Sequence, residues 1–244
     1  MATRFHIGAK TLRGDIASYA KRFDLLEVSS GAAGAGAPSL ATLRKWRKSV
    51  PPHFAFSVVA AQGLANLRAG EAFDRDVAFA LAAVDALEAR VLLLQTPAEV
   101  TPTALWRERI AKAIERFPRD VTHIAWEPRG VWEVDDAAVL AKKLGIVLTV
   151  DAARDPVPGG PVAYVRLRAL GETRSFGPSA LERVVQAIGP RRDAFVILET
   201  DSALGECKVL RKLAQAPVAF ERGGLGRVVR PRGATVTVRD DEQE

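Results

Sequence analysis

The chain has 244 residues, of which 48% are hydrophobic and 26% charged, a balance that is typical of a globular protein with a large core and excludes a disordered chain. Its one cysteine excludes an intramolecular disulfide and a cysteine zinc cage, and no apolar run or N-terminal signal segment indicates a membrane partner, so we expect a cytoplasmic protein. The net charge of +6 attracts anions, but most Lys and Arg residues fall on predicted helical faces, which favours a solvated surface over a nucleic-acid interface.

Apolar segments of strand length alternate along the chain with segments whose apolar residues recur at helical spacing. The strand segments are mostly apolar on both faces, which is typical of parallel strands buried between helices. In chain order the pattern predicts strand 4–9, strand 25–30, helix 39–48, strand 54–60, helix 72–89, strand 91–96, helix 103–117, strand 123–127, helix 134–144, strand 146–151, strand 163–167, helix 179–188, strand 195–200 and helix 204–215.

The ends of these elements carry local signals. Ser39 follows Pro38 as a typical helix N-cap, and Gly145 follows a helical segment as a residue that ends helices. The segment 152–161 that connects two predicted strands is short and rich in Pro and Gly, so we expect the sixth helix to be incomplete.

Strand and helix alternate about eight times, which predicts an α/β protein with a single (β/α)8 TIM-barrel domain. A doubly wound sheet is the alternative, and it would ordinarily carry a glycine-rich turn after its first strand to hold a dinucleotide. The Gly/Ala loop at 31–36 follows the second strand instead and leads into Pro38, so we expect no such cofactor. We place the barrel at 1–217 and an arginine-rich, partly disordered extension at 218–244.

Polar residues gather at the C-terminal ends of the predicted strands, which line the pocket in a TIM barrel. On the seventh strand Arg166 and Arg168 alternate with apolar residues, so both are expected to point inward. An inward arginine is costly to bury without a carboxylate or an anionic ligand, and Glu199 is one of the acids that could serve. The candidate site residues are Glu27, Gln95, Glu127, Arg129, Asp151, Arg166, Arg168 and Asp201.

Paired carboxylates can move protons, and fixed guanidinium groups can bind phosphate or carboxylate. We therefore predict Glu27 and Glu127 as catalytic residues and the other six candidates as substrate-binding residues, with no cofactor required. An oxygen-ligated Mg or Mn held by Glu27, Glu127 and Asp151 is the alternative. The three histidines share no spacing that would make a zinc site.

Several motifs resemble those of the YecE-like family, a TIM-barrel family that is also called domain of unknown function 72. The strongest motif is Tyr-Ala-Lys-Arg-Phe-Asp-Leu-Leu-Glu-Val-Ser-Ser at 19–30. The others follow in the family's order: Leu-Arg-Lys-Trp at 43–46, Pro-Pro-His-Phe-Ala-Phe at 51–56, Leu-Gln-Thr-Pro at 94–97, Trp-Glu-Pro-Arg at 126–129 and Tyr-Val-Arg-Leu at 164–167. The resemblance covers roughly residues 4–216 and implies a TIM barrel with a loose association with sugar isomerases, but no established reaction.

The chain departs from the family pattern at the candidate site. Val59 stands where the family tends to have Lys, Arg168 replaces a histidine, and Glu199-Thr200 replaces paired asparagines. The family's His-Pro-Ser-Trp segment is reduced to residues 130–132. These differences imply a divergent member that has changed its substrate or lost its activity.

Together these features predict an enzyme that acts on a small polar, anionic or sugar-like molecule by acid–base chemistry, through an isomerase, lyase or hydrolase reaction. The alternative is a non-catalytic barrel that binds nucleic acid or a phosphorylated ligand through its basic site and the arginine-rich extension. The sequence does not indicate which substrate is bound.

Overall fold

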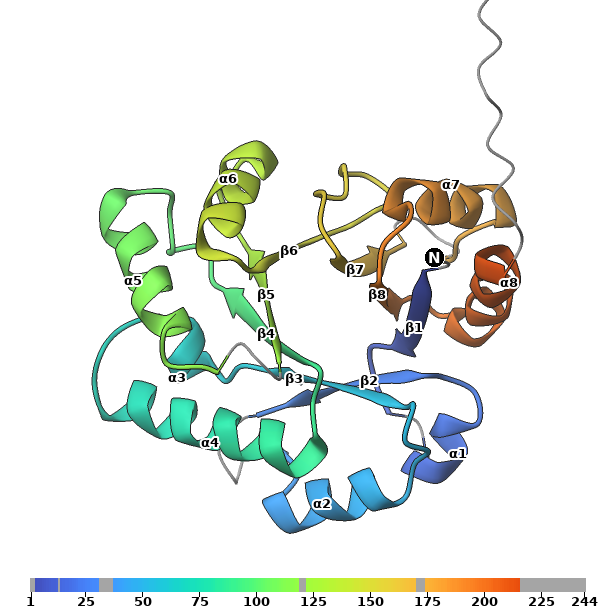
Figure 1. Ribbon diagram of the computed structural model, residues 1–244, viewed down its shortest axis with the longest axis horizontal. Helices are drawn as coiled ribbons and strands as arrows, with labels where there is room; N and C mark the ends of the chain where they lie inside the picture. The colour runs from blue at the N-terminus through green and yellow to red at the C-terminus, as the bar shows by residue number, and fades with distance from the viewer. Residues whose placement is uncertain (1–2, 13, 31–36, 119–121, 170–173, 216–244) are drawn as a thin grey trace, which may run out of the picture.

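The computed structural model of the chain describes residues 3–12, 14–30, 37–118, 122–169 and 174–215. Eight parallel strands form one sheet that curls into a nearly closed (β/α)8 barrel, with the helices around the outside (Figure 1). The predicted TIM barrel is therefore confirmed. Its elements are β1 (Arg4–Ala9), α1 (Ile16–Ala20), β2 (Leu25–Ser29), α2 (Leu40–Lys48), β3 (Ala55–Val59), α3 (Gln62–Ala65), α4 (Glu71–Leu87), β4 (Val91–Thr96), α5 (Ala104–Ile114), β5 (His123–Pro128), α6 (Val134–Leu144), β6 (Val147–Val150), β7 (Val162–Arg168), α7 (Pro178–Ile188), β8 (Asp193–Glu199) and α8 (Ala203–Gln215).

All the predicted strands and helices are present, with ends that differ from the prediction by up to three residues. Ser39 caps α2 by accepting a hydrogen bond from the Thr42 amide at 3.2 Å, and Gly145 ends α6 in the left-handed conformation, at φ 65°. The sequence pattern missed α1 and α3 because helices of five and four residues are too short to show a helical period. β6 leads to β7 without a helix, as the Pro- and Gly-rich connection indicated.

The buried apolar side chains divide between the inside and the outside of the barrel wall. A large cluster fills the space between strands and helices and includes Trp126, Leu92 and Val165. A smaller cluster, which includes Leu93 and Phe195, lies on the opposite faces of the strands, inside the barrel. Because strand residues alternate between faces, the polar residues that follow this inner cluster along each strand also point to the interior.

The barrel closes between β1 and β2 without a regular ladder. The Asp24 amide donates to the Ile7 carbonyl at 2.9 Å, and the buried Tyr19 hydroxyl donates to the Leu25 carbonyl at 2.9 Å. Gly8 lies at the closest approach, where a Cβ atom would come within 2.3 Å of the Leu25 carbonyl oxygen. Only glycine therefore lets the two strands meet at this seam.

None of the helices in the described ranges is long and apolar enough to cross a membrane. The predicted arginine-rich extension at 218–244 and the Gly/Ala loop at 31–36 lie outside the described residues.

Candidate active site

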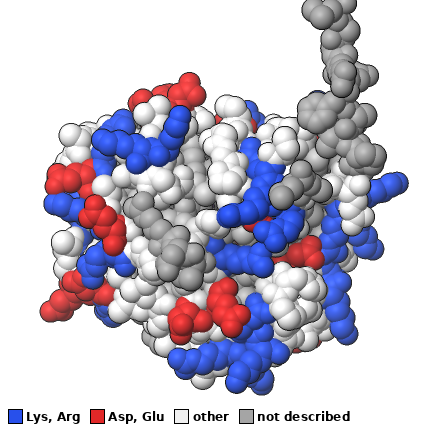
Figure 2. All heavy atoms as spheres, in the orientation of Figure 1, with Lys and Arg blue, Asp and Glu red and all other residues white. Residues whose placement is uncertain are grey.

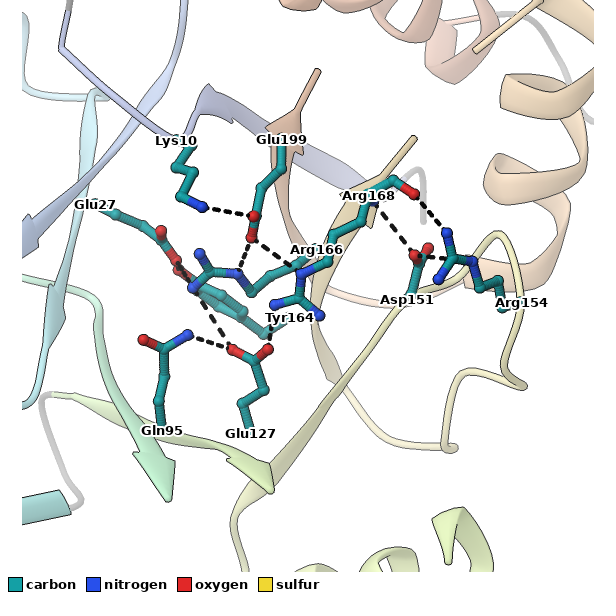
Figure 3. Close-up of polar contacts among 10 residues, drawn as sticks. All are labelled: Lys10, Glu27, Gln95, Glu127, Asp151, Arg154, Tyr164, Arg166, Arg168 and Glu199. Atoms are coloured by element: carbon teal, nitrogen blue, oxygen red, sulfur yellow. Dashed lines mark hydrogen bonds and ion pairs between the residues drawn. The ribbon is translucent and has the colours of Figure 1, made fainter. Parts of the chain in front are cut away.

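The strand register brings the predicted polar residues to the C-terminal end of the barrel. Gln95 on β4 pairs in register with Glu127 on β5, and Arg168 on β7 pairs with Glu199 on β8. Glu27 reaches the same region from β2 on the other side of the barrel, as Figure 3 shows. The ends of strands two, five, six and seven were expected to converge: strands two, five and seven do so, and Asp151, just beyond β6, lies beside them and accepts from the Arg168 amide.

Arg166 lies at the centre of this cluster and contacts three carboxylates (Figure 3). Its Nη1 lies 2.9 Å from Glu27 Oε1 and 3.6 Å from Glu127 Oε2, and its Nε donates to Glu199 Oε1 at 2.7 Å. The side chains of Arg166 and Glu27 are each only 5% exposed. Burial alone would lower the pKa of Arg166, but the three acids raise it, so the guanidinium stays charged.

Glu27 is bonded to Tyr164 as well as to Arg166. The Tyr164 hydroxyl donates to Glu27 Oε1 at 2.6 Å and lies 3.0 Å from Ser57 Oγ. Burial raises the pKa of Glu27 above its usual value, although Arg166 and Tyr164 act in the opposite direction. Burial and the neighbouring Glu27 also raise the pKa of Tyr164, so the phenol keeps its proton and serves as a donor.

Glu127 is held at both of its carboxylate oxygens. Gln95 Nε2 donates to Oε2 at 2.5 Å, and Arg168 Nη2 donates to Oε1. The Arg168 side chain is 37% exposed, so Glu127 joins the buried cluster to a group that solvent and ligands can reach. Burial tends to lower the pKa of Arg168, but Glu127 and Glu199 raise it, so Arg168 also remains cationic.

Glu199 is a member of the cluster that sequence reasoning left out of the site, although it was considered as an arginine partner. Its Oε1 accepts from Arg166 and lies 3.4 Å from Arg168 Nε, and its Oε2 lies 3.0 Å from Lys10 Nζ. Burial would raise the pKa of Glu199, but Arg166, Lys10 and Arg168 lower it overall. The period-two alternation along strand eight could have identified Glu199, and the alternation along strand seven puts Tyr164 on the same face as Arg166 and Arg168, whereas Lys10, just beyond β1, carried no clear signal.

An open cavity of about 490 Å³ lies over this cluster. Four cations and two carboxylates line it, so its wall is net positive. Figure 2 shows Lys and Arg side chains gathered toward the middle of one face of the molecule, with Asp and Glu residues beside them. The residues that line the cavity are Lys10, Gln95, Glu127, Pro128, Arg129, Gly130, Arg166, Arg168 and Glu199.

Asp151 and Arg129 flank the cluster without joining the ion pairs of Arg166. Asp151 accepts from the Arg168 amide at 3.3 Å and from the Ala153 amide at 3.1 Å, and it lies 3.7 Å from Arg154 Nε. Burial raises the pKa of Asp151 despite these donors. Arg129 is exposed at the rim, and its guanidinium makes no ion pair or hydrogen bond with the residues that the structure describes.

Asp201 lies apart from the other predicted site residues. It lines a separate cavity of about 160 Å³ with Tyr19 and Arg22. Asp201 is two residues beyond Glu199, where the chain has already turned away from β8 toward α8. The structure thus brings seven of the eight predicted residues to one rim and leaves Asp201 outside it.

The three carboxylates that the sequence offered as ligands for Mg or Mn form ion pairs with arginine side chains in the structure. Glu27 and Glu127 contact Arg166, and Asp151 contacts Arg154. Over the described part of the chain, no three His, Cys, Asp or Glu residues come together in a way that could hold a metal ion. The cluster is arranged as an ion-pair network.

Comparison of the sequence with models of known protein families identifies the family of this barrel. The family model described as "protein of unknown function DUF72" matches residues 5–221. This chain belongs to the DUF72 family. A search of the curated proteins finds no match to the DUF72 chain.

Solved structures with the same fold include two DUF72 proteins. The protein from Enterococcus faecalis is 17% identical, with a TM-score of 0.68 over 87% of this chain and 96% of that chain. The protein from Thermotoga maritima is 15% identical, with a TM-score of 0.67 over 87% of this chain and 100% of that chain. A xylose isomerase domain containing protein from Salmonella typhimurium is 15% identical, with a TM-score of 0.56 over 86% and 94%. At these identities the likeness shows a shared fold.

Proposed function

We propose that this DUF72 protein is an enzyme that binds a small anionic, sugar-like molecule in the 490 Å³ cavity and moves a proton with Glu127. The observation that carries the proposal is the mixed lining of this cavity, where four cations surround two carboxylates. A cavity of this volume suits a small molecule, and its net positive wall favours an anion.

Glu127 is the carboxylate best placed to touch a substrate. It lines the cavity, and Gln95 and Arg168 fix both of its oxygens. In the proposed reaction Glu127 takes a proton from a carbon that bears a hydroxyl group and lies beside a carbonyl group, and the carbonyl oxygen becomes an enediolate oxyanion. Glu127 then returns the proton to the former carbonyl carbon while the hydroxyl proton passes to the oxyanion, which leaves the carbonyl on the neighbouring carbon and gives the isomerised product. Arg168 and Lys10 stabilise the oxyanion, because both are cationic and open to the cavity.

Arg166 and Glu27 have supporting roles in this proposal. Arg166 already contacts three carboxylates, so it holds Glu127 and Glu199 in position. Glu27 is not among the residues that line the cavity, and it acts through Arg166. The sequence-based expectation that Glu27 itself moves a proton stays a prediction, and the reaction proposed here assigns that step to Glu127 alone.

The choice of sugar-like substrates draws on the fold as well as on the cavity. The similar Salmonella protein is described as containing a xylose isomerase domain, which makes sugars and sugar acids the first compounds to test. This likeness concerns the fold, and the substrate class rests on the charge and size of the cavity.

Solvent exchange tests the proposal without knowledge of the product. The protein is incubated in D2O with sugar phosphates and uronic acids, which carry both an anionic group and a carbonyl beside a hydroxylated carbon, and proton NMR follows the loss of C–H signals from the compounds that bind. We expect deuterium to enter one carbon of a bound compound, and Glu127→Gln to slow this about 100-fold or more, because a general base contributes roughly that much. Glu108→Gln, on the exposed surface of α5, is the matched control and should exchange at the wild-type rate.

The results distinguish the proposed enzyme from a non-catalytic barrel that binds nucleic acid or a phosphorylated ligand, a function that the net positive cavity also favours. Compounds that bind tightly but take up no deuterium would contradict the proposed chemistry. Salt-dependent binding of a short single-stranded oligonucleotide, with no binding of the small acids, would favour a nucleic-acid partner instead.

A further inference from the structure

A second group of charged side chains gathers at the N-terminal ends of the strands, at the opposite mouth of the barrel from the candidate active site. At its centre is Asp193, the first residue of β8, which is only 4% exposed. Arg4, the first residue of β1, contacts both oxygens of Asp193: Nε lies 2.9 Å from Oδ1, and Nη2 donates to Oδ2 at 3.0 Å. Arg192 Nε donates to the same Oδ2 atom at 3.0 Å. Two guanidinium groups therefore share one carboxylate.

Two histidines and a third arginine extend this group to other strands. On β1, His6 Nε2 lies 3.3 Å from Asp193 Oδ1. Arg90, just before β4, places its Nη1 3.5 Å from the same His6 nitrogen. Arg192 Nη2 lies 3.0 Å from Nε2 of His123, the first residue of β5. We call this group the basic mouth; its members are Arg4, His6, Arg90, His123, Arg192 and Asp193.

The basic mouth carries more positive charge than its own acid balances. Among the described residues, Asp193 is the only carboxylate that forms an ion pair with any of its three arginines. With both histidines neutral, three positive charges and one negative charge leave a net charge of +2. Like charges so close together repel one another, and an anion placed among them would relieve that repulsion.

The arginines of the basic mouth are open to solvent and have donors that the protein does not use. The side chains of Arg4 and Arg192 are 61% and 54% exposed, and Arg90 is half-buried. A guanidinium group has five N–H donors. Within the described ranges, Nη1 of Arg4, Nη1 of Arg192 and Nη2 of Arg90 donate no hydrogen bond. Each arginine can therefore bind an anion and keep its present contacts.

His6 already faces this excess of positive charge. Burial lowers the pKa of His6, although the hydrogen bond with Asp193 acts in the opposite direction. The charges of Arg90 and Arg4 lower the pKa further. An anion among the arginines would cancel part of their effect and make His6 easier to protonate.

His123 is affected in the same way. Burial lowers the pKa of His123, and the charge of Arg192 lowers it further. Arg90 acts in the same direction as Arg192, whereas Asp193 raises the pKa. Anion binding and protonation of the two histidines therefore favour each other, so an anion should bind more tightly as the pH falls.

We propose that the basic mouth is a second anion site, which binds the phosphate group of a small molecule at the end of the barrel opposite the candidate active site. A phosphate group suits the site better than a carboxylate, because its charge of about −2 matches the positive excess. Its tetrahedral oxygens can accept from guanidinium groups that come from several strands. The proposal does not depend on the proposed reaction, because no residue of the basic mouth lines the central cavity.

The histidines themselves can report the bound anion. The chain has only three, so proton NMR can follow each ring between pH 8 and pH 5, with His6→Gln and His123→Gln to assign the signals. The probe is sulfate, a tetrahedral dianion that does not titrate in this range, compared with sodium chloride at the same ionic strength. We expect sulfate to raise the pKa of His6 and of His123 by about 1 each, because a charge a few ångströms away has an effect of that order. His53, in an exposed turn, forms none of the contacts of the basic mouth and should not respond.

Two arginine variants separate this site from the central cavity. In Arg192→Gln, the sulfate concentration that half-saturates the His6 response should rise about tenfold or more, because a hydrogen bond to a charged group is worth at least that factor. Arg168→Gln, in the central cavity, should respond like the wild-type protein. Arg116→Gln is the matched control, because Arg116 lies on the exposed surface and pairs with Asp74.

The outcomes decide between a bound anion and a purely structural network. Sulfate that leaves His6 and His123 at their chloride values, or that moves all three histidines equally, would overturn the second site and leave the proposed function standing. Loss of the His6 response in Arg168→Gln, with none in Arg192→Gln, would place the anion in the central cavity and also overturn the proposal.

Discussion

Replacement of Arg166 by methionine is the sharpest perturbation of the ion-pair network. Methionine keeps an unbranched, flexible side chain but removes the charge that faces Glu27, Glu127 and Glu199. In the variant, Glu127 retains Arg168 and Glu199 retains Lys10. Among the described residues, Glu27 retains only the Tyr164 hydroxyl as a direct partner. The destabilisation should therefore come mainly from an uncompensated carboxylate at Glu27.

The magnitude follows from the burial of the pair. Arg166 and Glu27 are each 5% exposed, and removal of one partner of a buried ion pair costs about 3–5 kcal/mol. For a chain of this length, this lowers the melting temperature by about 6–20 °C. The second change Glu27→Gln removes the isolated charge, so the double variant should recover about 0.5–3 kcal/mol relative to Arg166→Met.

The assay is denaturant unfolding followed by circular dichroism at pH 8 and pH 5. Without Arg166 the pKa of Glu27, already raised by burial, rises further, so the folded state holds a proton that the unfolded state releases. Stability then falls as pH rises above the usual glutamate pKa, and the defect of Arg166→Met should be smaller at pH 5 than at pH 8.

The matched control is Arg116→Met, because Arg116 forms an exposed ion pair with Asp74 at 3.0 Å. This change should cost less than about 1 kcal/mol. The reasoning would be refuted if Arg166→Met cost no more than the control, or if Glu27→Gln failed to restore any of the loss.

Two further predictions concern the fold. Gly8→Ala should destabilise the protein by about 1–3 kcal/mol in thermal unfolding, because the new Cβ would meet the Leu25 carbonyl at 2.3 Å, whereas Gly205→Ala, with no heavy atom within 4 Å of the new Cβ, should be neutral or stabilising. A seam that tolerates Gly8→Ala as well as Gly205→Ala would contradict the close approach of β1 and β2. Burial lowers the pKa of His6, despite its contact with Asp193. As the pH falls, the unfolded state therefore takes up a proton before the folded state does, and stability should fall below about pH 6.5. His6→Gln should reduce this pH dependence in melting temperatures measured from pH 7.5 to 5. An unchanged slope would show that His6 does not carry this dependence.

Much of the site could be predicted from alternation along single strands. Glu27, Glu127, Arg166 and Arg168 lie on the strand face that also carries the inner apolar residues, and alternation along strand seven alone predicted that both arginines point inward. Asp201 lies outside the cluster because the chain has left the strand at that position. A single-strand argument applies only as far as the strand continues.

The remaining features depend on relations between strands that a single sequence does not display. The partner of Arg166 could have been any of several acids, and only the arrangement of the strands in space brings Glu199 to it. The close contact of Gly8 with Leu25 depends on how the barrel closes.

In the proposed reaction Glu127, which lines the cavity, exchanges a proton with the bound substrate, and Glu27, which does not line it, has no such role. Deuterium uptake from D2O into a bound uronic acid or sugar phosphate, compared between Glu127→Gln and Glu27→Gln, tests this assignment most directly. The structure predicts near-complete loss of uptake in Glu127→Gln and partial uptake in Glu27→Gln. Full uptake in Glu127→Gln, with loss confined to Glu27→Gln, would contradict the assignment.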